Sequence, residues 1–160
     1  MEDLTALRRR MIALEDALTR VQAEKDALEI EAHQDQLTGI GNRRLLEKRA
    51  SGRGGWFVLA DLNGFKAAQD AHPRGHAYGD EVLIEFAEFL LSESRADSED
   101  RVAVRLGGDE FVVWCQTKAG AERIQSAIRA WSSGPVSSSA GMGRDMESAD
   151  ANLYQDKRAA

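Results

Sequence analysis

Cysteine is almost absent from this sequence, because Cys115 is the only one among 160 residues. A single cysteine excludes an internal disulfide, and such usage is typical of a reducing cytosol. Since Cys115 lies in an apolar segment, we interpret it as a buried structural thiol and not as a nucleophile. The three histidines have no cysteine partners, which argues against a zinc site.

Long apolar runs and excess positive charge are also absent. No segment approaches the ~20 apolar residues that a membrane-spanning helix needs, and the charged N-terminus lacks the apolar core of a signal peptide. The formal net charge is −6, whereas non-specific nucleic-acid binding needs a basic face. We therefore expect a cytoplasmic protein that binds neither membranes nor nucleic acid. An anionic substrate would need a local basic patch or a metal.

The first 34 residues follow a heptad pattern. Apolar residues recur at spacings of three and four, and a period of 3.5 predicts a left-handed coiled coil. Lys25 is a polar residue at an a position, which restricts the oligomeric state. We expect residues 1–34 to be a dimerising helix that forms a parallel homodimer through residues 4–32. The alternative is a long helix folded back on its own domain. The a positions are Leu4, Met11, Leu18, Lys25 and Ala32, and the d positions are Leu7, Leu14, Val21 and Leu28.

Residues 102–115 combine two strand patterns with an acidic turn. Alternating apolar residues over 102–106 and an apolar run over 111–115 predict two strands. Between them, Gly107 and Gly108 supply the positive φ of a tight hairpin. Asp109 and Glu110 follow at once, and carboxylates on a rigid turn suit a hard cation such as Mg²⁺. The alternative is a surface turn with solvated acids.

A further acid, Asp61, ends the apolar segment 56–61. A glycine-containing loop follows, and a helix is expected to begin near Phe65 and to carry Lys66. A strand-end acid, a loop and a helix N-terminus suit a phosphate and metal site. The alternative is a plain strand–turn–helix connection. Asp80 is expected to cap an amphipathic helix, and the serine-rich segment 132–139 is expected to be a loop.

Five motifs occur in an order that resembles the GGDEF family of diguanylate cyclases, and together they cover nearly all of residues 35–160. They are Asp35-x-Leu37-Thr38-Gly39-x-x-Asn42-Arg43-Arg44, Asp61-Leu62-Asn63-Gly64-Phe65-Lys66, Gly75-His76-x-x-Gly79-Asp80, Arg105-x-Gly107-Gly108-Asp109-Glu110-Phe111 and Ala149-Asp150-Ala151-Asn152-Leu153-Tyr154-x-x-Lys157.

The resemblance implies an α+β domain over residues 35–160, with a central antiparallel sheet flanked by helices. It also implies the condensation of two GTP molecules into cyclic di-GMP and pyrophosphate by a homodimer, with one GTP per protomer and Mg²⁺ or Mn²⁺ as cofactor. The implied metal ligands are Asp61, the Leu62 carbonyl, Asp109 and Glu110. The implied catalytic residues are Asp109, Glu110 and Lys66, and the implied substrate-binding residues are Gly64, Phe65, Lys66, Gln69, His76, Asp80 and Lys157.

The chain departs from the family pattern at several positions. Gln69 stands where the family has Asn, and residues 71–74 make the following loop two residues longer. The inhibitory product site is replaced by Ser98 and Arg101, so we expect no feedback through it. These departures motivate two alternatives, a degenerate GTP-binding signalling module and an enzyme that also accepts ATP. Any upstream regulatory partner is unknown from the sequence.

Overall fold

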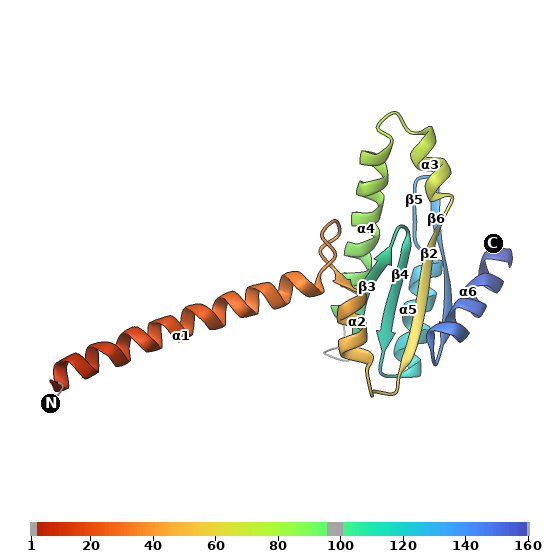
Figure 1. The fold of residues 1–160 in the computed structure, drawn as a ribbon. Helices are drawn as coiled ribbons and strands as arrows, with labels where there is room; N and C mark the ends of the chain where they lie inside the picture. The colour runs from red at the N-terminus through yellow and green to blue at the C-terminus, as the bar shows by residue number, and fades with distance from the viewer. Residues whose placement is uncertain (1–2, 96–100, 160) are drawn as a thin grey trace. The chain divides into compact units, whose positions relative to one another are not determined.

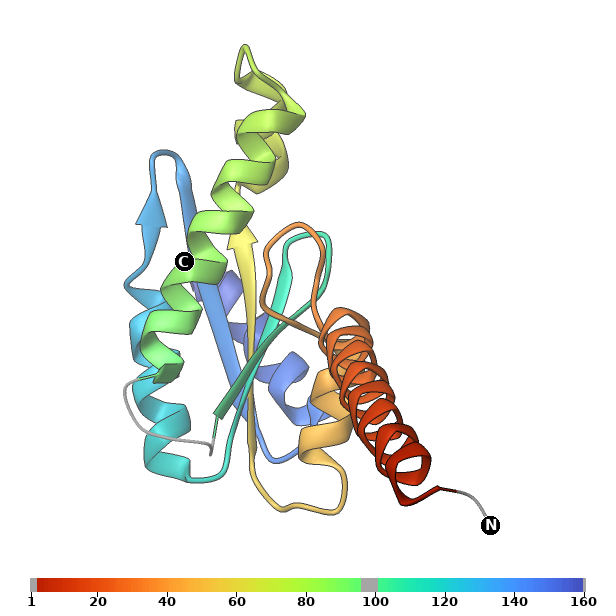
Figure 2. The same cartoon turned by 90° about the vertical axis from the view of Figure 1, so that its left-hand side faces the viewer.

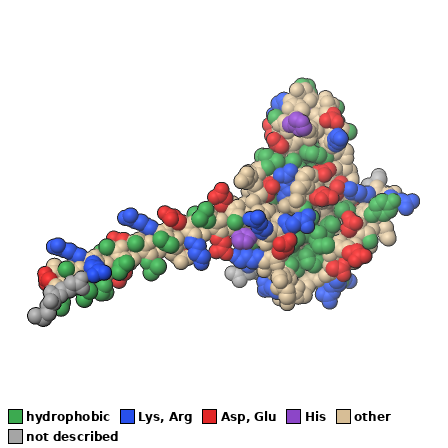
Figure 3. Space-filling view, in the orientation of Figure 1, with side chains coloured by type: hydrophobic (Ala, Val, Ile, Leu, Met, Phe, Trp, Pro, Cys, Tyr) green, Lys and Arg blue, Asp and Glu red, His purple; other side chains and the backbone are tan. Residues whose placement is uncertain are grey.

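The computed structural model describes residues 3–95 and 101–159 and divides the chain into two compact units, residues 1–33 and 34–160. The first unit is one helix, α1 (Leu4–His33), in which no side chain is buried. Its apolar heptad side chains are therefore exposed in the single chain, for example Leu14 at 66% and Leu18 at 70%. Figure 3 shows such side chains gathered along α1. The predicted unbroken helix is confirmed.

The second unit is built on one sheet of six strands in the described residues, in the order β1-β3-β4-β2-β6-β5. All neighbours are antiparallel except the short β1, which pairs with β3 in parallel. The strands are β1 (Gly41–Asn42), β2 (Trp56–Asn63), β3 (Arg101–Gly107), β4 (Glu110–Cys115), β5 (Ser132–Ser133) and β6 (Val136–Gly143). The helices are α2 (Arg43–Ala50), α3 (Phe65–Ala71), α4 (His76–Arg95), α5 (Lys118–Arg129) and α6 (Met146–Ala159). The expected α+β class is confirmed.

Helices cover both faces of the sheet (Figures 1 and 2). Successive strand residues point to opposite faces, and β2 shows this clearly. Val58, Ala60 and Leu62 join the larger core with α4 and α5, whereas Phe57 and Leu59 pack into a smaller core with α2. Asp61 has the same parity as Phe57 and Leu59, so its side chain lies on the smaller-core face, where α6 also packs.

Two glycines allow α6 to pack directly on β6. A Cβ at Gly141 would lie 2.1 Å from the Leu153 nitrogen, and a Cβ at Gly143 would lie 2.4 Å from the Ala149 nitrogen. Real side chains do not approach backbone atoms so closely, so only glycine fits at either position. The close approach fixes where the C-terminal half of α6 lies relative to the end of β2.

Two local expectations are wrong. Most of the serine-rich segment 132–139 is not a loop but the β5–β6 hairpin, because β6 pairs with β2 along residues 137–143 and Gly134, with φ of 56°, makes the turn. Asp80 does not begin its helix, because α4 starts at His76 after Gly75, whose φ is 50°. Asp80 therefore sits inside the helix, with its side chain exposed.

Candidate active site

The acidic residues of two motifs meet at one end of the sheet. Asp61 of β2 is the register partner of Glu110 of β4, and directly opposite residues have Cβ atoms about 5 Å apart on the same face. Asp109 lies just before Glu110, in the tight turn that Gly107 (φ 144°) and Gly108 (φ 55°) make. Within the described part of the chain, the Asp109 and Glu110 carboxylates have no hydrogen-bond or ion-pair partner. They are therefore available to bind a ligand.

The chemistry of these donors fits a hard divalent cation. Mg²⁺ typically binds one or two carboxylates together with substrate phosphates, and the sheet end offers the carboxylates of Asp61, Asp109 and Glu110. Among the described residues, no group of three or more acidic, histidine or cysteine side chains is gathered closely enough to hold a metal by itself. The arrangement suits a cation that arrives with a phosphate ligand rather than a closed structural site.

Two lysines supply positive charge beside the acids. Lys157 of α6 places its ammonium nitrogen 2.7 Å from Oδ1 of Asp61. Lys66 is exposed in the first turn of α3, which follows Gly64, a residue with φ of 73° that begins the helix. The positive φ favours glycine at this position. Lys157 therefore lies on the acidic end of the sheet, and Lys66 follows the same end of β2 along the chain.

Helices α3 and α4 bring together the predicted base-recognition residues. The Gln69 side-chain amide contacts Nδ1 of His76. A Cβ at Gly79 would lie 2.7 Å from the Gln69 oxygen, so the glutamine packs directly against α4, next to Asp80. The structure thus brings Gln69, His76 and Asp80 to one helix pair. The roles of these residues in substrate binding remain predictions.

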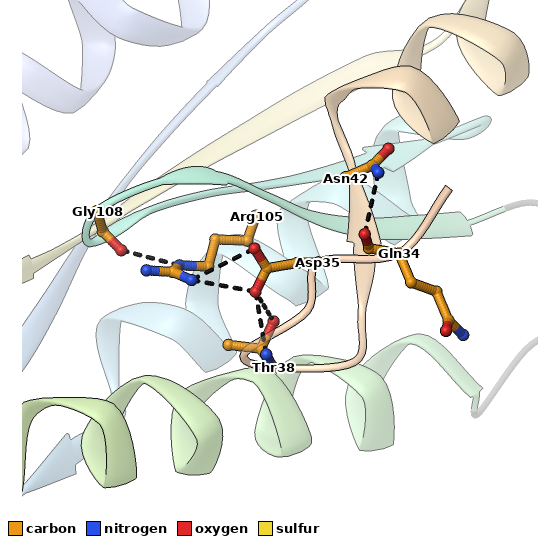
Figure 4. Close-up of polar contacts among 6 residues, drawn as sticks. All are labelled: Gln34, Asp35, Thr38, Asn42, Arg105 and Gly108. Carbon is orange, nitrogen blue, oxygen red and sulfur yellow. Dashed lines mark hydrogen bonds and ion pairs between the residues drawn. The ribbon is translucent and has the colours of Figure 1, made fainter. Parts of the chain in front are cut away.

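A hydrogen-bond network around Arg105 connects the acidic turn to the segment that contains Asp35 (Figure 4). Arg105 of β3 donates from Nε to the Gly108 carbonyl at 2.9 Å and from Nη1 to both Asp35 oxygens at 3.1 and 3.3 Å. Asp35 also accepts from the Thr38 backbone nitrogen at 3.0 Å and from its hydroxyl at 2.7 Å. One guanidinium group therefore ties the turn to the segment at the start of the second unit.

The pKa of Asp35 reflects this network. Burial by itself raises the pKa of the carboxyl group, but the hydrogen bonds from Thr38 and the charge and hydrogen bonds of Arg105 together outweigh it. The net effect is a pKa below the ordinary value of 3.8. Asp35 is therefore an ionised structural anchor at neutral pH. Sequence reasoning placed Asp35 and Arg105 in motifs but gave them no role, because their pairing spans the fold.

The sequence analysis gave no role to two further polar residues, Asp156 and Arg129. Asp156 of α6 accepts a hydrogen bond from the Ala140 nitrogen at 2.8 Å, and it pairs with Arg129 of α5 at 2.7 Å. No sequence motif indicates this contact, since it depends on how α5 and α6 flank β6.

Of the two positions that replace the inhibitory product site, Ser98 lies outside the described residues. Arg101 lines an open pocket of about 530 Å³.

Comparison with known proteins agrees with this geometry. The profile of the family described as "Diguanylate cyclase, GGDEF domain" matches residues 32–137. Diguanylate cyclase DgcS of Shewanella oneidensis is 32% identical over 172 aligned residues, which cover 91% of this chain and 56% of DgcS. The chain spans little more than half, or less, of the length of the first curated relatives it matches.

Solved structures show the same architecture. Diguanylate cyclase SiaD of Pseudomonas aeruginosa, solved with its activator SiaC, has a TM-score of 0.68 and 27% identity, with 98% of this chain and 71% of SiaD covered. The coiled coil and GGDEF domain of DgcB from Caulobacter crescentus, solved with c-di-GMP, has a TM-score of 0.74, with 97% and 96% covered. At 22% identity, the DgcB match supports the fold alone.

The fold and the acidic sheet end define a nucleotide-cyclase type of domain, an α+β unit with carboxylates on a central hairpin. The chain belongs to the GGDEF family of diguanylate cyclases, since the family profile matches well over half of its residues. None of the helices in residues 3–95 and 101–159 has both the length and the apolar character needed to cross a bilayer.

Proposed function

We propose that this chain is an active diguanylate cyclase that condenses two GTP molecules into cyclic di-GMP and two pyrophosphates. The observation that carries this proposal is the register pairing of Asp61 with Glu110 beside Asp109, with Lys157 on the same face. Diguanylate cyclases of this family depend on divalent metals, and the three carboxylates offer the oxygen donors such a cation prefers.

Each residue has a role that follows from its chemistry. The residues that would hold Mg²⁺ are Asp61, Leu62 through its carbonyl, Asp109 and Glu110. When bound, the cation would neutralise charge on the triphosphate and lower the pKa of the ribose 3′-hydroxyl. Asp109 lies beside the attacking hydroxyl and helps to remove its proton.

The lysines act on the phosphates and the helix pair acts on the base. Lys66 and Lys157 stabilise the negative charge that builds up on the phosphates as pyrophosphate leaves. Asp80 accepts hydrogen bonds from the guanine N1–H and 2-amino groups, which adenine does not offer. Gln69 and His76 lie beside it on the same pair of helices.

The reaction needs two copies of the chain, because each half-site holds one GTP. The apolar heptad side chains of α1 are exposed in the single chain, and burying an a/d seam against a second copy is the usual way to satisfy such a pattern. We therefore propose a parallel homodimer through residues 4–32 that brings two catalytic domains together.

Product formation tests the activity. The chain incubated with GTP and Mg²⁺ should yield cyclic di-GMP by chromatography and mass spectrometry, and both Asp109→Asn and Glu110→Gln should reduce the rate by at least about 100-fold. Glu122→Gln is the matched control, since Glu122 is an exposed acid in a surface pair with Lys118. Full activity in either site variant would contradict the assigned roles.

Product formation, measured together with GTP binding, distinguishes an active enzyme from a GTP-binding module without catalysis. The contact of Gln69 with His76 favours this second candidate function, because the amide that should meet guanine already has a partner. GTP binding by calorimetry without any product over a long incubation would establish it.

The dimer has its own test within the full chain. Leu18→Glu places a charge in the a/d seam and should weaken dimerisation by about tenfold or more, because an unpaired buried charge is costly. Ile12→Glu is the control, since Ile12 is also exposed, at 53%, but occupies a b position outside the seam. Sedimentation should show dissociation of the first variant alone, and activity should fall in parallel. Equal behaviour of the two variants would contradict the seam.

A further inference from the structure

Lys157 occupies the carboxylate that the proposed function assigns to a cation. Its ammonium nitrogen lies 2.7 Å from Oδ1 of Asp61, and the Asp61 side chain is only 16% exposed. The Asp61 carboxylate has a second oxygen and further lone pairs, but a divalent cation and an ammonium group held on one carboxylate repel each other. The ion pair with Lys157 therefore weakens the binding of a cation at Asp61.

The neighbouring residue, Asp156, anchors this part of α6 to the sheet. Its Oδ2 accepts from the Ala140 nitrogen at 2.8 Å, and its Oδ1 pairs with Arg129 at 2.7 Å. Arg129 in turn donates to the Ala140 carbonyl at 3.2 Å, and the Gln125 amide donates to the same carbonyl at 3.1 Å. Three side chains thus satisfy the peptide groups of a β6 residue on the edge that faces away from β2, as a neighbouring strand would. We call Asp156, Arg129 and the Ala140 peptide groups the edge clip.

The edge clip controls the direction of Lys157 through helix geometry. Successive helix residues point about 100° apart, so fixing Asp156 at the sheet edge turns Lys157 over the sheet face. Ala140 follows Ser139, which is the β6 register partner of Asp61. The clip therefore fixes α6 one residue from the strand level at which Lys157 meets Asp61. The backbone contact at Gly141 keeps the helix close to the sheet.

We propose that Asp156 is a positioning residue that holds Lys157 on Asp61, where the ammonium group competes with a divalent cation for the carboxylate. The inference rests on the proposed function, which makes Asp61 a cation ligand. In the protein without nucleotide, Lys157 compensates the Asp61 charge at the end of the sheet. When a cation takes Asp61, the released ammonium is already placed beside the triphosphate that accompanies the cation.

Cation binding without nucleotide tests the competition. Since the carboxylates among the described residues do not form a closed metal site, Mn²⁺ binds weakly without nucleotide, and it is titrated into the full chain up to saturation while free Mn²⁺ is measured by electron paramagnetic resonance. Lys157→Met should bind Mn²⁺ up to about fivefold more tightly, which is the effect of removing an ion pair worth ~1 kcal/mol. Lys118→Met is the control for lost positive charge, since Lys118 pairs with Glu122 and lies over Trp56, at the opposite end of β2 from Asp61. Its affinity should not change. If Lys157→Met binds Mn²⁺ no more tightly than the unaltered chain, the proposal is wrong.

A double-mutant cycle separates positioning from general stability. Asp156→Ala removes the part of the edge clip that lies on α6, while Arg129 still donates to the Ala140 carbonyl. Asp156→Asn keeps an oxygen for the Ala140 nitrogen but loses the charge that pairs with Arg129. Both should tighten Mn²⁺ binding, Asp156→Ala more, but neither should do so when Lys157 is already Met, because the competitor is gone. The same tightening in both backgrounds would overturn the positioning role. If the chain makes cyclic di-GMP and this cycle fails, only the inference falls. If the cycle succeeds and no product forms, only the proposed activity falls.

Discussion

Asp35 should contribute far more to stability than a surface acid, although it lies outside the acidic turn. The side chains of Asp35 and Arg105 are only 22% and 12% exposed, and the carboxylate accepts hydrogen bonds from Arg105 and from two Thr38 donors. A surface ion pair contributes ~0.2–1 kcal/mol, whereas breaking a fully buried pair costs ~3–5 kcal/mol. This half-buried network lies between the two limits.

We expect Asp35→Ala to lower the free energy of unfolding by about 2–3 kcal/mol, because it leaves Thr38 and Arg105 without their shared acceptor. Asp35→Asn keeps one oxygen for Thr38 and should cost about half as much. Urea unfolding followed by tryptophan fluorescence reports on the second unit, since all three tryptophans lie in it. The control is Asp70→Ala, an exposed acid on α3, which should change the free energy by less than about 0.5 kcal/mol.

The pH dependence gives a second readout with a defined sign. The pKa of Asp35 is lower in the folded chain than its ordinary value of 3.8. A carboxyl group with a lowered folded pKa contributes stability that is fully present above the unfolded value and is lost as the pH falls through the folded one. The difference between the unaltered chain and Asp35→Asn should therefore be constant from pH 7 to about pH 5 and shrink below 3.8. A cost under about 0.5 kcal/mol for Asp35→Ala, or a difference that grows in acid, would refute this reasoning.

Two further predictions concern the packing of the second unit. Gly141→Ala should destabilise the chain by about 3 kcal/mol, because its Cβ would collide with the α6 backbone. Gly54→Ala is the control, since a Cβ there has open space, and its unfolding midpoint in urea should be nearly unchanged. Equal midpoints for the two variants would contradict the close packing. Burial raises the pKa of the Cys115 thiol to about 11, so a thiol reagent at pH 8 should modify this residue only after the chain unfolds. The stability that the raised pKa contributes should be lost as the pH rises from about 9 towards 11. Rapid labelling of the folded chain would contradict the burial.

The acidic turn could be predicted from the sequence because its geometry is local. Gly107 and Gly108 permit the positive φ angles of a short hairpin, and the apolar segments on either side form the paired strands. Long α1 was likewise predictable, since a heptad period and the absence of glycine and proline determine a helix without reference to other parts of the chain.

The β5–β6 hairpin could not be predicted in the same way. Serine and glycine have weak strand propensity, and residues 137–143 become a strand because they pair with β2 while α5 and α6 pack against them. Tertiary packing overrides local preference at this segment. The beginning of α4 was missed for a related reason, since Gly79 lies inside α4 at a position where a side chain would collide with Gln69 of α3.

By itself, the sequence determined which residues are chemically able to act, namely the acids, lysines and glycines of the motifs, because side-chain chemistry and short-range turn geometry are local properties. Only the tertiary structure decided which of them meet. The pairing of Asp61 with Glu110 depends on strand register, and the contact of Lys157 with Asp61 depends on how closely α6 packs on β6. Such distances join residues far apart in the chain, and no local pattern specifies them.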